Sequence, residues 1–300
     1  MQDVRIQKVL SEMGVCSRRA AEQIIREGRV KLNGRPVSVG DKMNTARDLL
    51  TVDDKKILIP KKREYYYLML YKPRGYITTT SDERGRKTVM DLVADVPERV
   101  FPVGRLDKDS EGLLLFTNDG DFANLLTHPS HGVSKLYRVT VRPHATEEQI
   151  IALTNGVTLD DGSVTMPAVI RVITDEPDRT VLEMTIREGK NRQIRRMCEA
   201  VHLDVIRLRR SSLGAVKLGM LQPGEHRNLT PQEVAALRAA ATKGKTTATI
   251  EKNTERNAKQ AARTRGKNAA YAQKGAGKGG KKPAVHSRSA AAPRKGGIIK

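Results

Sequence analysis

Residues 104–120 read GRLDKDSEGLLLFTNDG. The apolar run 113–116 predicts a buried strand and 101–103 predicts another, so Asp107 falls on a loop between two strands. A carboxylate presented by a Gly-flanked turn beside a buried strand is a common way to hold a rigid nucleophile or general base. From spacing alone, a surface ion pair between Arg105 and Asp107 explains the same residues equally well.

Strands and helices alternate irregularly around this loop, over residues 64–240. The further predicted strands are 65–71, 136–141, 164–172, 180–186 and 205–208, and the predicted helices are 122–127, 146–153, 191–201 and one that begins at Thr230. This order lacks the regular strand–helix–strand repeat of a parallel sheet, so the sequence predicts an α+β domain with a mixed, largely antiparallel sheet.

Residues 1–60 have the pattern of a separate, smaller unit. Apolar residues recur with helical spacing from residue 6 to 13, and Ser17 is a good N-cap for a second helix. Asn33-Gly34 between two short apolar runs is a strong hairpin signal. The sequence therefore predicts two helices followed by a hairpin, with exposed cations on the second helix that include Arg18 and Arg19.

The charge of the chain is concentrated at its C-terminal end. Residues 241–300 hold 16 Lys or Arg against two Asp or Glu, which is two thirds of the net charge of +21. With few branched aliphatic residues, this stretch is predicted to be a disordered basic tail that attracts phosphate backbones. No run of about 18 apolar residues and no signal-peptide pattern is present, so we expect a cytoplasmic protein without a membrane partner.

Four cationic or polar patches of the larger domain are candidates for a common site. They are Lys72-Pro-Arg-Gly75, Arg105-Leu-Asp107, Lys135-Leu-Tyr137 and Gly189-Lys-Asn-Arg-Gln-Ile-Arg-Arg196. Strand alternation puts Lys135 and Tyr137 on one face. No metal cluster, phosphate loop or dinucleotide fingerprint competes with these patches. An aspartate with a nearby arginine and a stacking tyrosine suits glycosidic-bond chemistry on a base extruded from structured RNA.

These motifs resemble a known family. Residues 3–50, with Ser17-Arg-Arg19 and Val30-Lys-Leu-Asn-Gly34, look like the S4 RNA-binding module. Residues 64–240 resemble the catalytic domain of the RsuA-type ribosomal RNA pseudouridine synthases, through the four patches in the family's order. The implied layout is an S4-like domain at 1–60, a catalytic domain at 64–240 and a basic tail at 241–300.

The resemblance implies that one uridine of ribosomal RNA is isomerised to pseudouridine without a metal or cofactor. Asp107 would be the essential carboxylate, as nucleophile or as base. Tyr137 would stack on the flipped uracil, and Arg195 would pair with Asp107. The remaining implied contacts with substrate RNA are Arg105, Lys72 and Lys135 in the catalytic domain, and Arg18 and Arg19 in the S4-like domain.

Within the family the motifs are most similar to those of the enzymes that modify the large-subunit (23S) RNA. Structured 23S ribosomal RNA is therefore the expected partner, free or in an assembling ribosomal subunit, and the expected oligomeric state is a monomer. Two alternatives stay open. The target could be the small-subunit (16S) RNA, or the chain could be a non-catalytic, RNA-binding ribosome-assembly factor.

Overall fold

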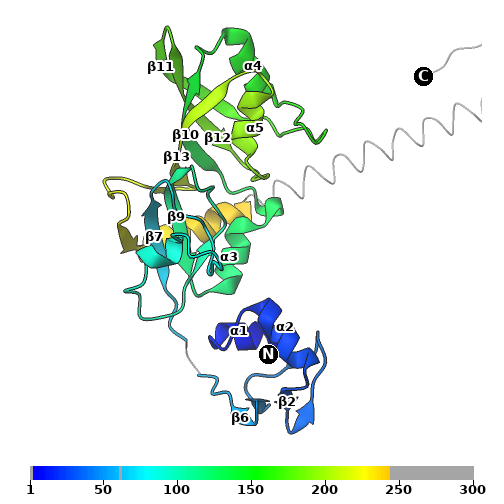
Figure 1. Ribbon diagram of the computed structural model, residues 1–300. Helices are drawn as coiled ribbons and strands as arrows, with labels where there is room; N and C mark the ends of the chain where they lie inside the picture. Colours follow the sequence, from blue (N-terminus) through cyan, green and yellow to red (C-terminus); the bar gives the residue numbers. More distant parts are fainter. Residues whose placement is uncertain (1–2, 61–62, 244–300) are drawn as a thin grey trace, which may run out of the picture. The chain divides into compact units, whose positions relative to one another are not determined.

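The computed structural model describes residues 3–60 and 63–243 (Figure 1). The tail predicted for 241–300 lies outside the described residues from 244 onward. Within the described residues, no helix is long and apolar enough to cross a lipid bilayer.

The N-terminal module, residues 3–60, has two helices, a two-stranded sheet, a four-stranded sheet and its own apolar core. Its elements are β1 (Val4–Arg5), α1 (Ile6–Glu12), α2 (Arg18–Arg26), β2 (Val30–Leu32), β3 (Arg35–Pro36), β4 (Lys42–Met43), β5 (Leu50–Val52) and β6 (Lys55–Lys56). The predicted cap of α2 is confirmed, because the Ser17 hydroxyl accepts a hydrogen bond from the Ala20 amide. The helices bury Leu10 and Ile25 against Val30 of the sheet.

The predicted hairpin is confirmed, but the sheet around it is larger than expected. Asn33 and Gly34 join β2 to β3 with φ values of 50° and 80°, as a type I′ turn requires. The other edge of β2 pairs with β5, which in turn pairs with β6. The sequence did not predict β5, because three residues of alternation are too few to distinguish a strand from a loop.

The second domain is built on one mixed sheet with the strand order β11-β12-β10-β13-β9-β7-β15, to which β8 and β14 add. Its strands are β7 (Tyr67–Lys72), β8 (Phe101–Val103), β9 (Glu111–Thr117), β10 (Lys135–Arg142), β11 (Val169–Glu176), β12 (Arg179–Ile186), β13 (Asp204–Leu213), β14 (Val216–Lys217) and β15 (His226–Asn228). Among the described residues, only β13 and β9 pair in parallel, over Arg209↔Glu111 and Arg210↔Gly112. The largely antiparallel sheet is thus confirmed.

The four predicted helices of this domain are present with shifted ends, and the structure adds two short 3-10 helices, η1 and η2, that the sequence did not predict. The helices are η1 (Val89–Leu92), α3 (Gly120–Thr127), η2 (Pro129–His131), α4 (Glu147–Asn155), α5 (Gln193–Glu199) and a last helix over 231–243. α3 begins two residues early because the Asp119 carboxylate caps the Asp121 and Phe122 amides. α5 begins two residues late because Arg192, its N-cap, has a left-handed backbone with φ 45°.

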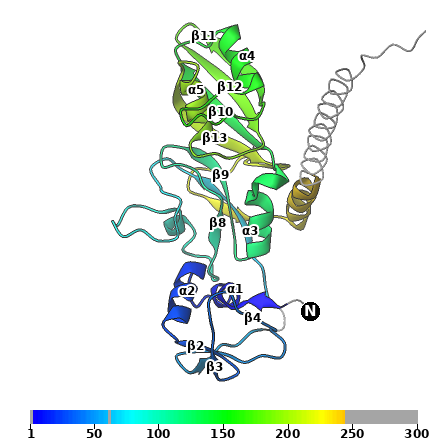
Figure 2. The ribbon, with the colours of Figure 1, turned by 90° about the vertical axis from the view of Figure 1, so that its right-hand side faces the viewer.

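The helices cover different faces of the sheet in its two halves (Figure 1, Figure 2). α4 and α5 pack on one face of β10, β12 and β13, where they bury Val139, Leu182 and Met197 in one cluster. α3 and the helix over 231–243 pack on β7 and β9 in a second cluster, which contains Leu115 and Phe122. The first cluster continues onto the other face of β7 and β9, where it includes Leu70 and Phe116, so this half of the sheet is buried on both faces.

Candidate active site

The loop that carries Asp107 connects β8 to β9 and is held by backbone contacts on both sides of this residue. The Thr78 hydroxyl donates to the Leu106 carbonyl at 2.7 Å and accepts from the Leu106 amide at 3.3 Å. The Gly75 amide donates to the Lys108 carbonyl at 2.7 Å. The backbone around Asp107 is therefore fixed, while its side chain keeps 32% of its surface exposed.

The carboxylate that pairs with Arg195 is Asp109, which corrects the predicted pairing with Asp107. Arg195 Nη2 lies 3.1 Å from Asp109 Oδ2, and its Nη1 donates to the Val205 carbonyl at 2.9 Å. That carbonyl, on β13, holds the guanidinium in line with Asp109. Asp107 instead has Arg192 Nη1 at 3.7 Å from its Oδ2.

Asp109 is thus an ionised anchor for α5. Burial alone would raise the pKa of its carboxyl, but Arg195 and Arg192 outweigh burial and hold this pKa below its usual value. Burial also lowers the pKa of the Arg195 guanidinium, against the opposing effect of Asp109 and Asp107. Asp107 carries no such strong ion pair and stays open to a ligand.

A pocket of about 200 Å³ opens over Asp107 and brings together four of the eight predicted site residues. Arg105 and Asp107 line it from the loop before β9, and Lys135 and Tyr137 line it from β10, on one face as predicted. Tyr137 is only 8% exposed, so its ring is part of the wall and is held in place by the core. The pocket therefore combines a part-exposed carboxylate, an aromatic wall and several cations.

Two further residues of the pocket were missed by the sequence interpretation. Arg210 and Ser110 line the pocket and are almost fully buried, yet Arg210 Nη2 and Ser110 Oγ have no hydrogen-bond partner among the described residues. The Arg210 Nε donates to the Leu113 carbonyl at 2.6 Å, and this hydrogen bond fixes the orientation of the guanidinium group. A buried donor without a partner is costly unless a ligand satisfies it. Extending the predicted strand 205–208 by two residues would have placed Arg210 on this face.

Lys72 is placed differently from the prediction. It is fully buried, and its ammonium donates to the carbonyls of Ser110 at 2.7 Å and Pro73 at 3.0 Å. Its predicted contact with RNA is therefore corrected to a structural one, because the strand run 67–72 carries it into the core. Burial lowers its pKa to about 8, although Asp107 and neighbouring carboxylates oppose the shift. Burial, reinforced by Arg210, also lowers the pKa of Lys135 to about 8.

We expect the buried ammonium of Lys72 to make stability depend on pH. Between pH 8 and 10.5 the unfolded chain holds a proton at Lys72 that the folded protein has released, so the free energy of unfolding should rise with pH. In Lys72→Met this rise should be smaller, as measured by urea unfolding at several pH values. Lys217→Met, which removes an exposed ammonium, is the control. Equal slopes in wild type and Lys72→Met would contradict the burial of a titrating lysine.

The predicted RNA contacts Arg18 and Arg19 lie outside this pocket. Both are exposed, in the first turn of α2 in the N-terminal module. Their side chains have no ion pair within the part of the chain that the structure describes. They form a cationic surface of the module, as predicted, and their contact with RNA stays a prediction.

A part-exposed carboxylate in a cationic, aromatic-walled pocket, on a chain that also has a basic helical module, is the arrangement expected of an RNA-modifying enzyme. The family model for RNA pseudouridylate synthases matches residues 66–200, and the S4 domain model matches residues 4–44. Ribosomal large subunit pseudouridine synthase B of Bacillus subtilis is 43% identical over 243 residues, which cover 80% of this chain and 98% of the relative. The chain therefore belongs to the RNA pseudouridine synthase family, and it is an isomerase.

Other relatives and one solved structure agree. Ribosomal large subunit pseudouridine synthase B of Pseudomonas aeruginosa is 37% identical over 266 residues, covering 85% of this chain and 69% of the relative. An RNA pseudouridine synthase of Aquifex aeolicus is 44% identical over 239 residues, which cover 79% of this chain and 94% of the relative. A crystal structure of a pseudouridylate synthase superposes with a TM-score of 0.57 and 30% identity, over 78% of this chain and 99% of that one.

Proposed function

We propose that this chain isomerises one uridine of the large-subunit (23S) ribosomal RNA to pseudouridine, with Asp107 as the essential group. The observation that carries the proposal is an open Asp107 carboxylate beside the Tyr137 ring in one pocket. The names of the Bacillus and Pseudomonas relatives support the large subunit as the source of the RNA.

The chemistry asked of Asp107 is the breaking of the C1′–N1 bond. Its carboxylate attacks C1′ while N1 leaves with the bonding pair, or it removes the C2′ proton so that a glycal forms. The freed uracil then turns and C5 bonds to C1′, which releases the Asp107 carboxylate in the first route, whereas in the second route C2′ takes its proton back. Finally C5 loses its proton and N1 gains one. No electrons are exchanged with a second reactant and no water is consumed.

The other pocket residues position the nucleotide. The Tyr137 ring stacks on the flipped base, and its hydroxyl assists removal of the C5 proton. The free Nη2 of Arg210 and the ammonium of Lys135 donate to oxygen atoms of the nucleotide, because both groups can only donate. Arg105, which is exposed at the pocket edge, contacts the adjoining phosphate. Arg195 keeps α5 against the Asp107 loop through Asp109.

The arrangement we propose for the whole chain is an RNA-binding module at 1–60 and a catalytic domain at 64–240. Arg18 and Arg19 anchor structured RNA through phosphates while the pocket takes the target uridine. The chain acts as a cytoplasmic monomer, on free ribosomal RNA or on an assembling subunit, since its substrate is made and assembled there. The helix over 231–243 crosses the proposed boundary at 240 by three residues.

Unmodified transcripts of both ribosomal RNAs test the proposal directly. Purified protein is incubated with 23S or 16S transcript, and pseudouridine is mapped by carbodiimide treatment and primer extension. A new stop in 23S alone is expected. A stop in 16S alone would show that the small-subunit RNA is the substrate. The absence of a stop in both RNAs would favour the alternative of a non-catalytic, RNA-binding assembly factor.

Tyr137→Phe separates stacking from proton transfer. Because the ring is kept, RNA affinity should stay at the wild-type value, while loss of the hydroxyl should slow a single turnover on the order of 100-fold. Quench-flow and filter binding measure the two quantities. Tyr66→Phe, a half-buried tyrosine packed against the same core, is the matched control. A wild-type turnover rate in Tyr137→Phe would restrict Tyr137 to stacking.

A further inference from the structure

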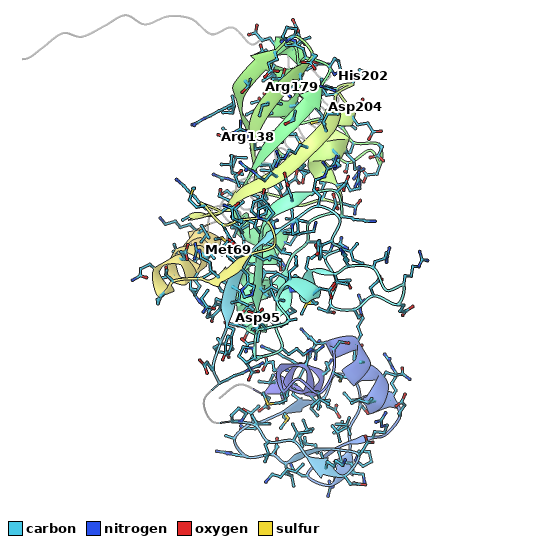
Figure 3. All side chains as sticks on the ribbon, turned by 60° about the vertical axis from the view of Figure 1, so that its left-hand side comes forward. Met69, Asp95, Arg138, Arg179, His202 and Asp204 are labelled. Atoms are coloured by element: carbon cyan, nitrogen blue, oxygen red, sulfur yellow. The ribbon has the colours of Figure 1, made fainter. Side chains whose placement is uncertain are left out.

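One face of the β10–β13 half of the sheet has no helix over it within the described residues. Tyr137 and Arg138 are consecutive on β10, so their side chains point to opposite faces. Tyr137 points to the face that α4 and α5 cover, and Arg138 is exposed on the other. Figure 3 shows Arg138 and Arg179 on this half of the sheet. The second face is open to solvent along strands that are buried on the first.

Arginines gather on this open face. We call it the arginine face, and its members are Arg138, Arg171, Arg179, Arg207 and Arg209. Four of them, with Thr140 and Val181, line a hollow of about 310 Å³. Arg138 and Arg209 are direct register partners on β10 and β13. Like charges placed opposite one another on paired strands destabilise a sheet. An anion bound between Arg138 and Arg209 would offset this repulsion.

The carboxylates of the domain do not supply that anion. Arg179 pairs with Glu176, and Arg207 pairs with Glu111. The guanidinium groups of three members have no ion pair or hydrogen-bond partner among the described residues: those of Arg138, Arg171 and Arg209. Glu183 is the register partner of both Arg138 and Arg171, yet its carboxylate lies within ion-pair distance of neither. Three guanidinium groups on one open face are therefore left for a ligand.

We propose that the arginine face binds the phosphate backbone of the same RNA whose uridine enters the pocket, at a segment distant from that uridine. This rests on the proposed function, which puts a long polyanion in contact with the domain. The hollow has no aromatic lining residue, so it would hold phosphates without reading bases. A second hollow shares Arg209 and continues to Lys217, and Glu183 and Tyr71 also line it. RNA must pass around the sheet to reach both faces, so only a long substrate makes both contacts.

The RNA affinity of the double variant Arg138→Gln/Arg209→Gln tests the inference. The variant is made in an Asp107→Asn parent, which prevents turnover, and is compared with that parent. The probes are the full 23S transcript and a short hairpin cut from it around the modified uridine. For the transcript we expect affinity to fall about tenfold and the slope of log K against log salt to flatten by about 1.5, because two phosphate contacts are lost. The hairpin should bind as it does to the parent. Arg138→Lys/Arg209→Lys, which keeps the charges, should retain most of the transcript affinity.

Several results would overturn the inference. The first is a transcript affinity and a salt slope that are unchanged in the Gln variant. The second is a loss of affinity in the Gln variant that is equal for hairpin and transcript. The third is a loss of transcript affinity in the Lys variant as large as in the Gln variant, which would indicate altered packing. If wild-type protein modifies no RNA, the proposed function fails by itself and no hairpin can be chosen. The transcript-binding comparison needs no turnover and still decides the role of the arginine face.

Discussion

Asp107→Asn should abolish pseudouridine formation, with a loss of at least about 10⁴-fold in turnover, while RNA affinity is retained. The amide has the shape of the carboxylate but is neither a nucleophile nor a base. The contacts of Thr78 with Leu106 and of Gly75 with Lys108 hold the loop by backbone groups that the change does not touch. Release of tritium from RNA labelled at uracil C5 measures turnover, and filter binding measures affinity.

The neighbouring carboxylate provides the matched control for this prediction. Asp109 differs from Asp107 in its role, since it is the one that pairs with Arg195. Asp109→Asn should therefore weaken the attachment of α5 and reduce turnover about 10- to 100-fold, with residual activity left. An inactive Asp109→Asn beside an active Asp107→Asn would reverse the two assignments.

Gly112→Ala should destabilise the catalytic domain by roughly 3–5 kcal/mol, the largest stability effect that we predict. A Cβ at Gly112 would lie 2.3 Å from the Arg210 carbonyl oxygen and 2.7 Å from the Arg210 nitrogen, and both are backbone atoms of a paired strand. In addition, φ is +107° at Gly112, a region that L side chains avoid. We expect thermal unfolding at a clearly lower temperature, together with loss of activity.

Gly120→Ala is the control for this substitution. Gly120 begins α3 and lacks a positive φ, and a Cβ added there would meet no heavy atom within 4 Å. Alanine is the better helix former, so the melting temperature of this variant should stay level or rise slightly. A Gly112→Ala protein that melts within about 2 °C of wild type would show that β13 can move away from β9 without cost.

The sequence predicted the elements that local patterns specify. The buried strand after Asp107, the cap at Ser17 and the shared face of Lys135 and Tyr137 all follow from short-range periodicity and side-chain chemistry, and the structure confirms them. The family resemblance then supplied the function, which the relatives support.

Other features depend on tertiary contacts that no local pattern records. The partner of Arg195 is decided by the Val205 carbonyl on a neighbouring strand. The sequence did not predict the burial of Lys72, because a lysine directly before a proline is typical of an exposed turn. Arg210 escaped notice because β13 continues through three arginines, Arg207, Arg209 and Arg210, which look like a solvated segment when only apolar residues are counted.

The parallel pairing of β13 with β9 is only two residues long, and it joins the half of the sheet that carries Tyr137 to the half that carries Asp107. Arginine side chains reinforce this joint: Arg207 contacts Glu111, Arg210 contacts the Leu113 carbonyl and Arg195 contacts Asp109. The width of the cleft between Asp107 and Tyr137 should therefore depend on these three arginine contacts as well as on the backbone pairing.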